Sequence, residues 1–236
     1  MTDQNVDPAE ISKFNSLAAR WWDKQGDFLP LHDLNPLRAN YIAQHSQLDE
    51  AQAIDVGCGG GILTESLAAA GARVTGIDMS EAPLAVARLH ALESGLDIRY
   101  LQSTAEQISE EESGAYEVVC CLEMLEHVPE PSAVVQACAK LAKPGARLYF
   151  STINRNPKSF VFAIVGAEYV LRLLPRGTHE YRKLIKPSEL HQWCRDAGLE
   201  VEESLGVTYN PVTRDFSISQ RDLSVNYMIR CRKSPI

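Results

Sequence analysis

The chain has 236 residues, of which 45% are hydrophobic, and carries a formal net charge of −8. This length and composition suit a single core, so we expect one domain over residues 1–236. The acidic balance argues against a nucleic-acid partner held by general electrostatics. No apolar run is long enough to span a bilayer, the first residues lack the pattern of a signal peptide, and six scattered cysteines match no zinc spacing. We therefore expect a cytoplasmic protein.

Two helices are predicted within residues 1–50. Residues 7–10 (DPAE) combine an N-cap acid, a proline at the first helical position and a glutamate three residues after the cap. Apolar residues then recur at helical spacing over residues 11–22. Residues 35–38 (NPLR) begin a second helix by the same logic. We expect this N-terminal segment to form a helical lid over a ligand.

From residue 53 onward, apolar strands alternate with helices, which is typical of a parallel sheet covered on both faces. Helices are expected near residues 62–70, 82–94 and 132–142, with another from 187 to 198. The chain is thus predicted to be an α/β protein that binds its ligand outside the carboxyl ends of the strands. The predicted strands lie near residues 53–56, 73–77, 98–101, 116–121, 147–152, 200–208 and 225–231.

The most specific motif is a glycine turn after the first predicted strand. Residues 55–61 read DVGCGGG, and a second acid, Asp78, ends the next strand about twenty residues after the turn, the spacing at which βαβ units bind a ribose diol. Glycines let the backbone approach a ligand that side chains would exclude. The spacing lacks the G-x-G-x-x-G of dinucleotide sites. The run resembles motif I of the class I S-adenosylmethionine (SAM) methyltransferases, which implies SAM as the cofactor.

A second group of functional residues follows the fourth predicted strand, where residues 122–129 read LEMLEHVP. Two carboxylates and an imidazole, from Glu123, Glu126 and His127, could bind Mg²⁺ or another hard divalent cation with water completing its shell. The same groups could supply a general base for a phenol, whose ordinary pKa is near ~10. In many class I methyltransferases this segment lines the cofactor and its histidine is structural. The three interpretations stay open on sequence.

Beyond these motifs, the chain resembles the bacterial ubiquinone-biosynthesis O-methyltransferases over nearly its whole length. The resemblance implies a Rossmann-like, seven-stranded class I methyltransferase fold with an N-terminal helical extension and a helical insertion after strand five. It also implies methyl transfer from SAM to a ring hydroxyl of a polyprenylated phenol or catechol. Metal-dependent relatives imply that Glu123, Glu126 and His127 bind a cation. The segments that carry the resemblance are residues 19–23, 30–32, 35–38, 55–61, 122–129, 151–156 and 166–169.

These motifs define a predicted site. The Arg38 guanidinium suits the carboxylate of SAM, Asp78 suits its ribose, and residues 103–106 are placed to meet its adenine. Glu126 and His127 are the predicted catalytic residues. The predicted cofactor contacts are Arg38, Gly57, Gly59, Asp78, Met79, Ala105 and Leu122.

Residues 154–186 form an insertion where a compact fold needs only a short connection. The segment is apolar and carries seven basic residues against two acidic ones, a composition typical of a segment that lies on an anionic bilayer. A helical cap over the substrate is the alternative. We expect peripheral association with the inner membrane, a polyprenyl phenol or quinol substrate, and other ubiquinone-biosynthesis proteins as further partners.

Other functions fit the sequence less well. An NAD-dependent oxidoreductase needs the missing G-x-G-x-x-G motif. A methyltransferase that acts on an RNA 2′-hydroxyl needs a basic face with aromatic side chains, against a net charge of −8 here. A non-catalytic SAM-binding protein has no need of Glu126 and His127. Another small phenolic acceptor stays open as an alternative substrate.

Overall fold

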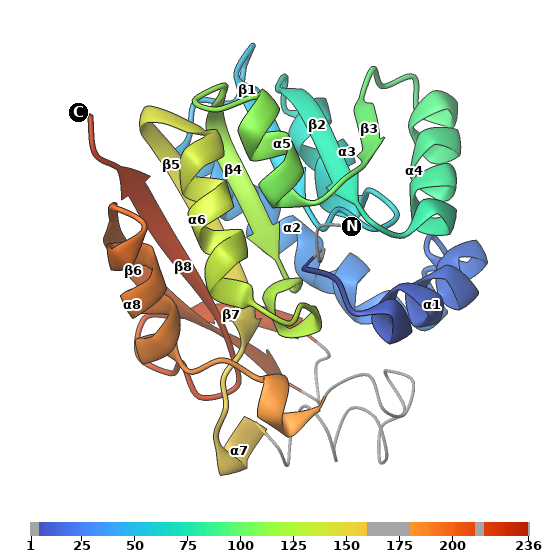
Figure 1. The fold of residues 1–236 in the computed structure, drawn as a ribbon. Helices are drawn as coiled ribbons and strands as arrows, with labels where there is room; N and C mark the ends of the chain where they lie inside the picture. Colours follow the sequence, from blue (N-terminus) through green and yellow to red (C-terminus); the bar gives the residue numbers. More distant parts are fainter. Residues whose placement is uncertain (1–4, 160–179, 211–214, 236) are drawn as a thin grey trace.

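A mixed sheet of eight strands, in the order β3-β2-β1-β4-β5-β8-β6-β7, forms the centre of the molecule (Figure 1). The computed structural model describes residues 5–159, 180–210 and 215–235. The strands are β1 (Gln52–Val56), β2 (Arg73–Asp78), β3 (Arg99–Gln102), β4 (Tyr116–Leu122), β5 (Ala142–Ile153), β6 (Leu199–Asn210), β7 (Asp215–Ser219) and β8 (Asn226–Lys233). The helices are α1 (Pro8–Leu17), α2 (Leu29–His45), α3 (Ile62–Ala69), α4 (Glu81–Glu93), α5 (Ala105–Glu111), α6 (Pro131–Leu141), α7 (Pro157–Ser159) and α8 (Pro187–Asp196). Three short 3₁₀ helices are η1 (Ala18–Arg20), η2 (Leu125–His127) and η4 (Tyr181–Lys183).

The first five strands are parallel, and β8 is antiparallel to both of its neighbours, β5 and β6. The chain runs outward from β1 through β2 to β3 and then returns to pair β4 with β1. This reversal places a crevice at the carboxyl ends of β1 and β4, where open α/β sheets bind ligands. The predicted α/β class is confirmed. The eighth strand, β7, was not predicted: it is a short edge strand that pairs only with β6.

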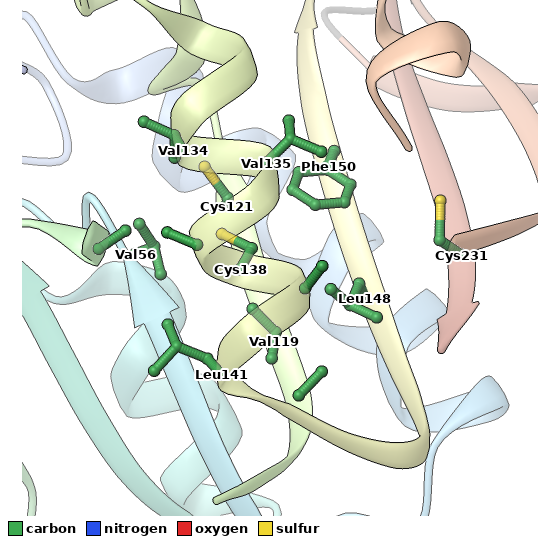
Figure 2. Packing of buried hydrophobic residues seen from close by; sticks show 14 of the residues in the cluster. Val56, Val119, Cys121, Val134, Val135, Cys138, Leu141, Leu148, Phe150 and Cys231 are labelled. Atoms are coloured by element: carbon green, nitrogen blue, oxygen red, sulfur yellow. The ribbon is translucent and has the colours of Figure 1, made fainter. Parts of the chain in front are cut away.

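The sheet is buried because helices cover both faces. On one face, α6 packs its apolar side on β4 and β5, and α5 and α8 lie on either side of it (Figures 1 and 2). On the other face, α2 and α3 contribute Ile42 and Leu67, both fully buried. The six cysteines are all buried free thiols and pack as small apolar residues. The α6 contact contains Val134, Val135, Cys138 and Leu141 against Val119, Cys121, Leu148 and Phe150.

The N-terminal helices differ from their predicted bounds. Helix α1 ends at Leu17, and the chain then turns through η1, so Trp21 and Trp22 lie outside the predicted helix. Helix α2 begins at Leu29, not at residue 35. Pro30 occupies the first turn, where its missing N–H is not needed, and Pro36 lies inside the helix. Asn35 caps nothing: its amide donates to the Ile62 carbonyl and the Ser66 hydroxyl on α3.

Helix α5 was missed by the sequence analysis, although a local signal was present. Thr104 caps the helix by accepting from the Gln107 N–H at 3.2 Å, and the Gln107 side chain accepts from the Thr104 N–H. This T-x-x-Q capping box is a recognised helix start.

The predicted insertion lies largely outside the described residues, which omit 160–179. Its ends are described as α7 and η4. Among the described residues, none of the helices has the length and apolar character that a membrane crossing requires.

Candidate active site

A cavity of about 930 Å³ lies at the carboxyl ends of β1, β2 and β4. Helix α1 and the start of α2 form its outer side, beyond the ends of these strands (Figure 1). Glu126 is the only predicted site residue that does not line it. The predicted residues in its wall are Arg38, Gly57, Gly59, Asp78, Met79, Ala105, Leu122, Glu123 and His127.

The glycine turn forms part of the cavity wall and leaves room for the side chains packed on it. Gly57 and Gly59 have φ angles of +75° and +52°, which residues with a Cβ adopt at a cost. A Cβ on Gly57 would lie 2.3 Å from the Met124 Cγ, and one on Gly59 would lie 2.1 Å from the Trp21 ring. The Gly59 N–H donates to the Asp78 Oδ2 at 2.9 Å, so the turn and the acid predicted to act together are in direct contact.

Two carboxylates meet beside this turn. Burial and the nearby charge of Asp78 raise the pKa of Asp55 to about 6, although the Thr64 hydroxyl donates to its Oδ2 at 2.6 Å. Burial also raises the pKa of Asp78, against the N–H groups of Ser80 and Gly59 that bind it. A ligand that brings hydroxyl donors or positive charge to this wall would relieve the cost of the buried negative charge.

The cavity wall also contains a buried ion pair. Arg38 of α2 is 5% exposed and its Nη2 pairs with Glu123, while its Nε has no partner among the described residues. Glu123 also accepts from the Ser151 hydroxyl at 2.7 Å and from the Asn226 amide at 2.9 Å. Its φ of +54° is unusual for a residue with a side chain and costs on the order of 1–3 kcal/mol, the kind of strain that collects at functional sites.

His127 is held by a residue from the far end of the sequence. Its Nδ1 lies 3.1 Å from the Glu10 Oε2 of α1, and its ring meets Phe14 edge-on at 5.1 Å between centroids. Although burial opposes ionisation of Glu10, the hydrogen bond and charge of His127, with that of Lys13, lower its pKa to about 2. Sequence reasoning treated Glu10 only as a helix-start residue. It missed this contact because the two residues are 117 positions apart.

Glu126 lies on the same 3₁₀ turn as His127 but points into the core. It is 3% exposed, its Oε2 accepts from the Thr152 hydroxyl at 2.8 Å, and its Oε1 has no partner among the described residues. Burial, with the charge of Glu123, raises the pKa of Glu126 to about 8. The structure therefore brings Glu123 and His127 to the cavity but not the third member of the predicted cluster.

The remaining wall is apolar and comes from both ends of the chain. Ile11 and Phe14 of α1 face the cavity, as do Val207, Tyr209 and Phe216 of the β6–β7 hairpin. The Tyr209 and Phe216 rings contact each other with centroids 4.9 Å apart. This wall was not predicted, because no single segment of the sequence carries a recognisable pattern of it.

The N-terminal segment covers the glycine turn with two tryptophans. The Trp21 ring lies against Gly59 and Gly60 and stacks on Phe28 at 4.0 Å. The Trp22 Nε1–H donates to the Gly60 carbonyl at 2.8 Å, and its ring stacks on His90 at 3.4 Å. The turn is thus sealed on its outer side by residues 21 and 22.

Comparisons with known proteins place this site in a class. The sequence model of one family, described as a methyltransferase domain, matches residues 31–204. In fold, the chain is similar to the crystal structure of magnesium protoporphyrin IX methyltransferase from Synechocystis, with bound SAH, at a TM-score of 0.72 and 22% identity over 96% of this chain and 99% of that one. The fold is therefore that of a SAM-dependent methyltransferase.

Curated relatives narrow the class. A ubiquinone biosynthesis O-methyltransferase of Saccharophagus degradans is 60% identical over 235 residues, which cover 99% of this chain and 100% of the relative. One from Pseudomonas aeruginosa is 58% identical over 229 residues, covering 97% and 98%. The chain therefore belongs to the family of ubiquinone biosynthesis O-methyltransferases, and it is an enzyme that transfers a methyl group to oxygen.

Proposed function

We propose that the chain transfers the methyl group of SAM to a ring hydroxyl of a polyprenylated phenol or catechol in ubiquinone biosynthesis, with His127 as the general base. One observation carries the proposal. A single cavity of about 930 Å³ joins the glycine turn and Asp78 to His127 and to an apolar wall. A donor site, a base and a surface for an apolar acceptor therefore share one cavity.

The residues present fit SAM. Asp78, bound by two N–H groups, has lone pairs left to accept from the ribose hydroxyls, and Gly57 and Gly59 line the same cavity. The unpartnered Nε of Arg38 can donate to the carboxylate of the methionyl part. When bound, SAM supplies a methyl group activated by a sulfonium. The other proposed contacts are Met79, Ala105 and Leu122.

In this proposal His127 removes the proton from the acceptor hydroxyl. A phenol hydroxyl must lose its proton as its oxygen takes the methyl group, and a positioned base contributes typically about 10²- to 10⁴-fold to such a step. Alignment of the two reacting atoms can supply a further ~7–11 kcal/mol. The apolar wall of Phe14, Tyr209 and Phe216 is suited to the ring and the first part of a prenyl chain.

The predicted metal site does not fit the described residues well. Glu123 already accepts from Arg38, Ser151 and Asn226, and Glu126 faces Thr152 outside the cavity. Within the part of the chain that the structure describes, no three His, Cys, Asp or Glu side chains are grouped as a metal would require. Cation binding by Glu123, Glu126 and His127 stays a prediction, as does a catalytic role for Glu126, and no step is derived through a metal. An activity assay after chelation, with Mg²⁺ added back, tests the metal.

Membrane access is part of the proposal. A polyprenyl substrate partitions into lipid, and residues 154–186 combine apolar stretches with a basic surplus suited to an anionic surface. We propose a cytoplasmic enzyme that associates peripherally with the inner membrane and contacts other ubiquinone-biosynthesis proteins there. Residues 1–50 act as the lid over the bound ligand.

Co-sedimentation with anionic liposomes tests the membrane contact. It compares the wild type with a folded variant that lacks residues 160–174. Equal binding by the two would contradict it.

The test of function is methyl transfer to a short-tailed demethylubiquinol, followed by mass spectrometry. The wild type is expected to methylate it with SAM, and His127→Ala to lose roughly 10²- to 10⁴-fold in kcat with SAM affinity retained by calorimetry. His191→Ala is the matched control, because His191 bonds Ser204 outside the cavity. Faster methylation of an RNA or of an unprenylated phenol would overturn the proposed substrate, and a fully active His127→Ala would overturn the base.

A further inference from the structure

We propose that Asn5 holds the chain before α1 closed over the nucleoside end of the cavity, and that it thereby sets the rate at which the product S-adenosylhomocysteine (SAH) leaves. The inference rests on the proposed function because it places SAM and SAH at the glycine turn and residues 103–106. Asn5 belongs to neither the glycine motif nor the cluster after β4. It acts on cofactor exchange and not on the methyl transfer itself.

The first argument is the set of hydrogen bonds that this one side chain makes. The Asn5 Nδ2 donates to the Glu106 Oε1 and to the Glu130 carbonyl, each at 2.9 Å, and its Oδ1 accepts from the Glu130 N–H at 2.8 Å. The amide thus uses both of its donors and its acceptor, a set that neither a carboxylate nor an apolar side chain can reproduce. Glu106 lies in the first turn of α5, and Glu130 is the N-cap residue of α6. Asn5 therefore joins the chain before α1 to the starts of two helices that lie 101 and 125 positions away.

The second argument is the place of these contacts on the cavity. Asn5 and Glu106 both line it, together with residues 103–105, the segment proposed to meet the adenine. The chain that follows Asn5 continues along the same wall with Val6 and Asp7. The three hydrogen bonds of Asn5 therefore close the part of the cavity in which the nucleoside of SAM is proposed to bind.

The third argument is that the two ends of α1 are held in different ways. No residue of α1 is buried, and segments with few buried contacts open at a low free-energy cost. Beyond the far end of the helix, Trp21 is 6% exposed and stacks on Phe28 at 4.0 Å. The near end is held to α5 and α6 by the polar contacts of Asn5. We therefore expect the helix to move about η1, with the Asn5 end moving furthest.

The product explains why this closing contact matters for turnover. SAH keeps the nucleoside and the amino-acid part of SAM and lacks only the methyl group and the sulfonium charge. The contacts that hold SAM therefore still hold SAH after the reaction. Release of product from a closed site limits the turnover of many enzymes. Breakage of the Asn5 contacts would be the step that frees SAH and admits the next SAM.

Other contacts of α1 give an alternative account and supply a control. Glu10 contacts His127, and Asp7 pairs with Lys183 at 3.0 Å. If these contacts alone held the cavity closed, removal of the Asn5 side chain would leave SAH release unchanged.

Asn15, near the other end of α1, is the matched control. Its Oδ1 accepts from the Ala82 N–H, in the first turn of α4, at 3.1 Å. Asn15 is thus a second asparagine bonded to the backbone at the start of a helix, but it does not line the cavity.

The experiment measures SAH dissociation from the immobilised full-length protein by surface plasmon resonance. Asn5→Ala is expected to raise the dissociation rate constant roughly 10-fold, because three solvent-accessible hydrogen bonds each contribute towards the lower end of the usual net range. The rate of methyl transfer in a single turnover, started from enzyme saturated with SAM, is expected to change by less than ~3-fold. Asn15→Ala is expected to leave both rates within ~3-fold of the wild type. Unchanged SAH dissociation in Asn5→Ala, or an equal increase in Asn15→Ala, would overturn the inference.

An exchange of the two polar groups gives a second test. Asn5→Asp keeps the size of the side chain and the acceptor for the Glu130 N–H, but it loses both donors and places a second carboxylate beside Glu106. We expect it to release SAH at least as fast as Asn5→Ala. Adding Glu106→Gln supplies an amide donor opposite the new carboxylate, and it is expected to slow SAH release at least ~3-fold relative to Asn5→Asp alone. A double variant as fast as Asn5→Asp would overturn the inference. If Asn5→Ala does not fold by circular dichroism, this comparison decides alone.

Failure of this inference is distinguishable from failure of the proposed function. SAH release is measured without an acceptor, so a chain that does not methylate the demethylubiquinol can still show the effect of Asn5. If the wild type does not bind SAH, both proposals fail. If the wild type methylates the demethylubiquinol and Asn5→Ala releases SAH at the wild-type rate, only the role of Asn5 is rejected.

Discussion

The two halves of the cavity are built in different ways. Apart from Arg38 of α2, the donor half comes from one continuous stretch, β1 to β4, and its central feature is the backbone of the glycine turn against Asp78. The acceptor half is assembled from the two ends of the chain and the segment after β4: Glu10, His127 and Phe216 come from three separate regions. One half depends on the absence of side chains, and the other depends on side chains brought together by tertiary structure.

Because the two halves are built differently, we expect substitutions in them to have different effects. The donor half rests on buried parallel strands, which open only with the whole domain. Helix α1, which carries the acceptor-side residues Ile11 and Phe14, has no buried residue along its length. We therefore expect substitutions in the donor half to abolish SAM binding and those in the acceptor half to alter turnover while the fold persists.

The largest effect is expected from Gly59→Ala. The new Cβ would lie 2.1 Å from the buried Trp21 ring, and the residue must also keep a φ of +52°. Overpacking costs typically ~1–3 kcal/mol, and if this is lost from binding, SAM affinity falls by up to about 100-fold. Isothermal titration calorimetry measures it.

Gly95→Ala is the matched control for this substitution. Gly95 also has a positive φ, +68°, but a Cβ there meets nothing within 4 Å. It is expected to cost about 1–2 kcal/mol of stability through backbone strain alone, and no SAM affinity. Equal loss of affinity in both variants would mean that strain, not the closeness of Trp21, governs the donor half.

The donor half was predictable because its chemistry is local. Glycines at fixed spacing and a carboxylate at the end of the next strand are recognisable without knowing where the rest of the chain lies. The structure brings Gly59 and Asp78 into contact as that pattern requires. Strand alternation likewise predicted the sheet, and only the short edge strand β7 was missed.

The acceptor half was only partly predictable. The sequence placed Glu123, Glu126 and His127 side by side, but a 3₁₀ turn sends Glu126 into the core and His127 towards the cavity. No sequence signal of helical or strand period distinguishes these directions over three residues. Glu10 was treated as part of a helix start because its partner His127 lies 117 positions away.

A smaller effect is expected at Trp22, which joins the lid to the donor half. Trp22→Ala removes both the stack on His90 and the hydrogen bond to the Gly60 carbonyl. We expect SAM affinity to fall by roughly 10-fold, consistent with loss of one partly buried hydrogen bond and a ring contact of ~0.5–1.5 kcal/mol each.

Trp22→Phe separates the two contributions, since it keeps an aromatic ring on His90 but loses the Nε1–H donor. It is expected to recover about half of the lost binding free energy in the same titration. If Trp22→Ala binds SAM as tightly as the wild type, residues 21 and 22 cover the glycine turn without stabilising it. SAM binding in the donor half would then not depend on the N-terminal lid.

The smallest effect on turnover is expected from Glu126→Gln. This variant tests whether Glu126, behind the cavity wall, belongs to the acceptor half. Glu126 has a pKa of about 8 in the folded chain against an ordinary value of 4.5, so between these values the folded state binds a proton that the unfolded state lacks. Wild-type stability contributed by this group is therefore present below pH ~4.5 and is lost as the pH rises towards ~8. Gln carries no such proton, and it keeps an oxygen to accept from Thr152.

We expect the kcat of Glu126→Gln to stay within ~3-fold of the wild type. Its free energy of unfolding, measured by urea titration, is expected to exceed that of the wild type by an amount on the order of 1–3 kcal/mol between about pH 5 and pH 8.5. A 100-fold fall in kcat with normal SAM binding would instead place Glu126 in the chemistry, and the acceptor half would then extend behind the cavity wall into the core.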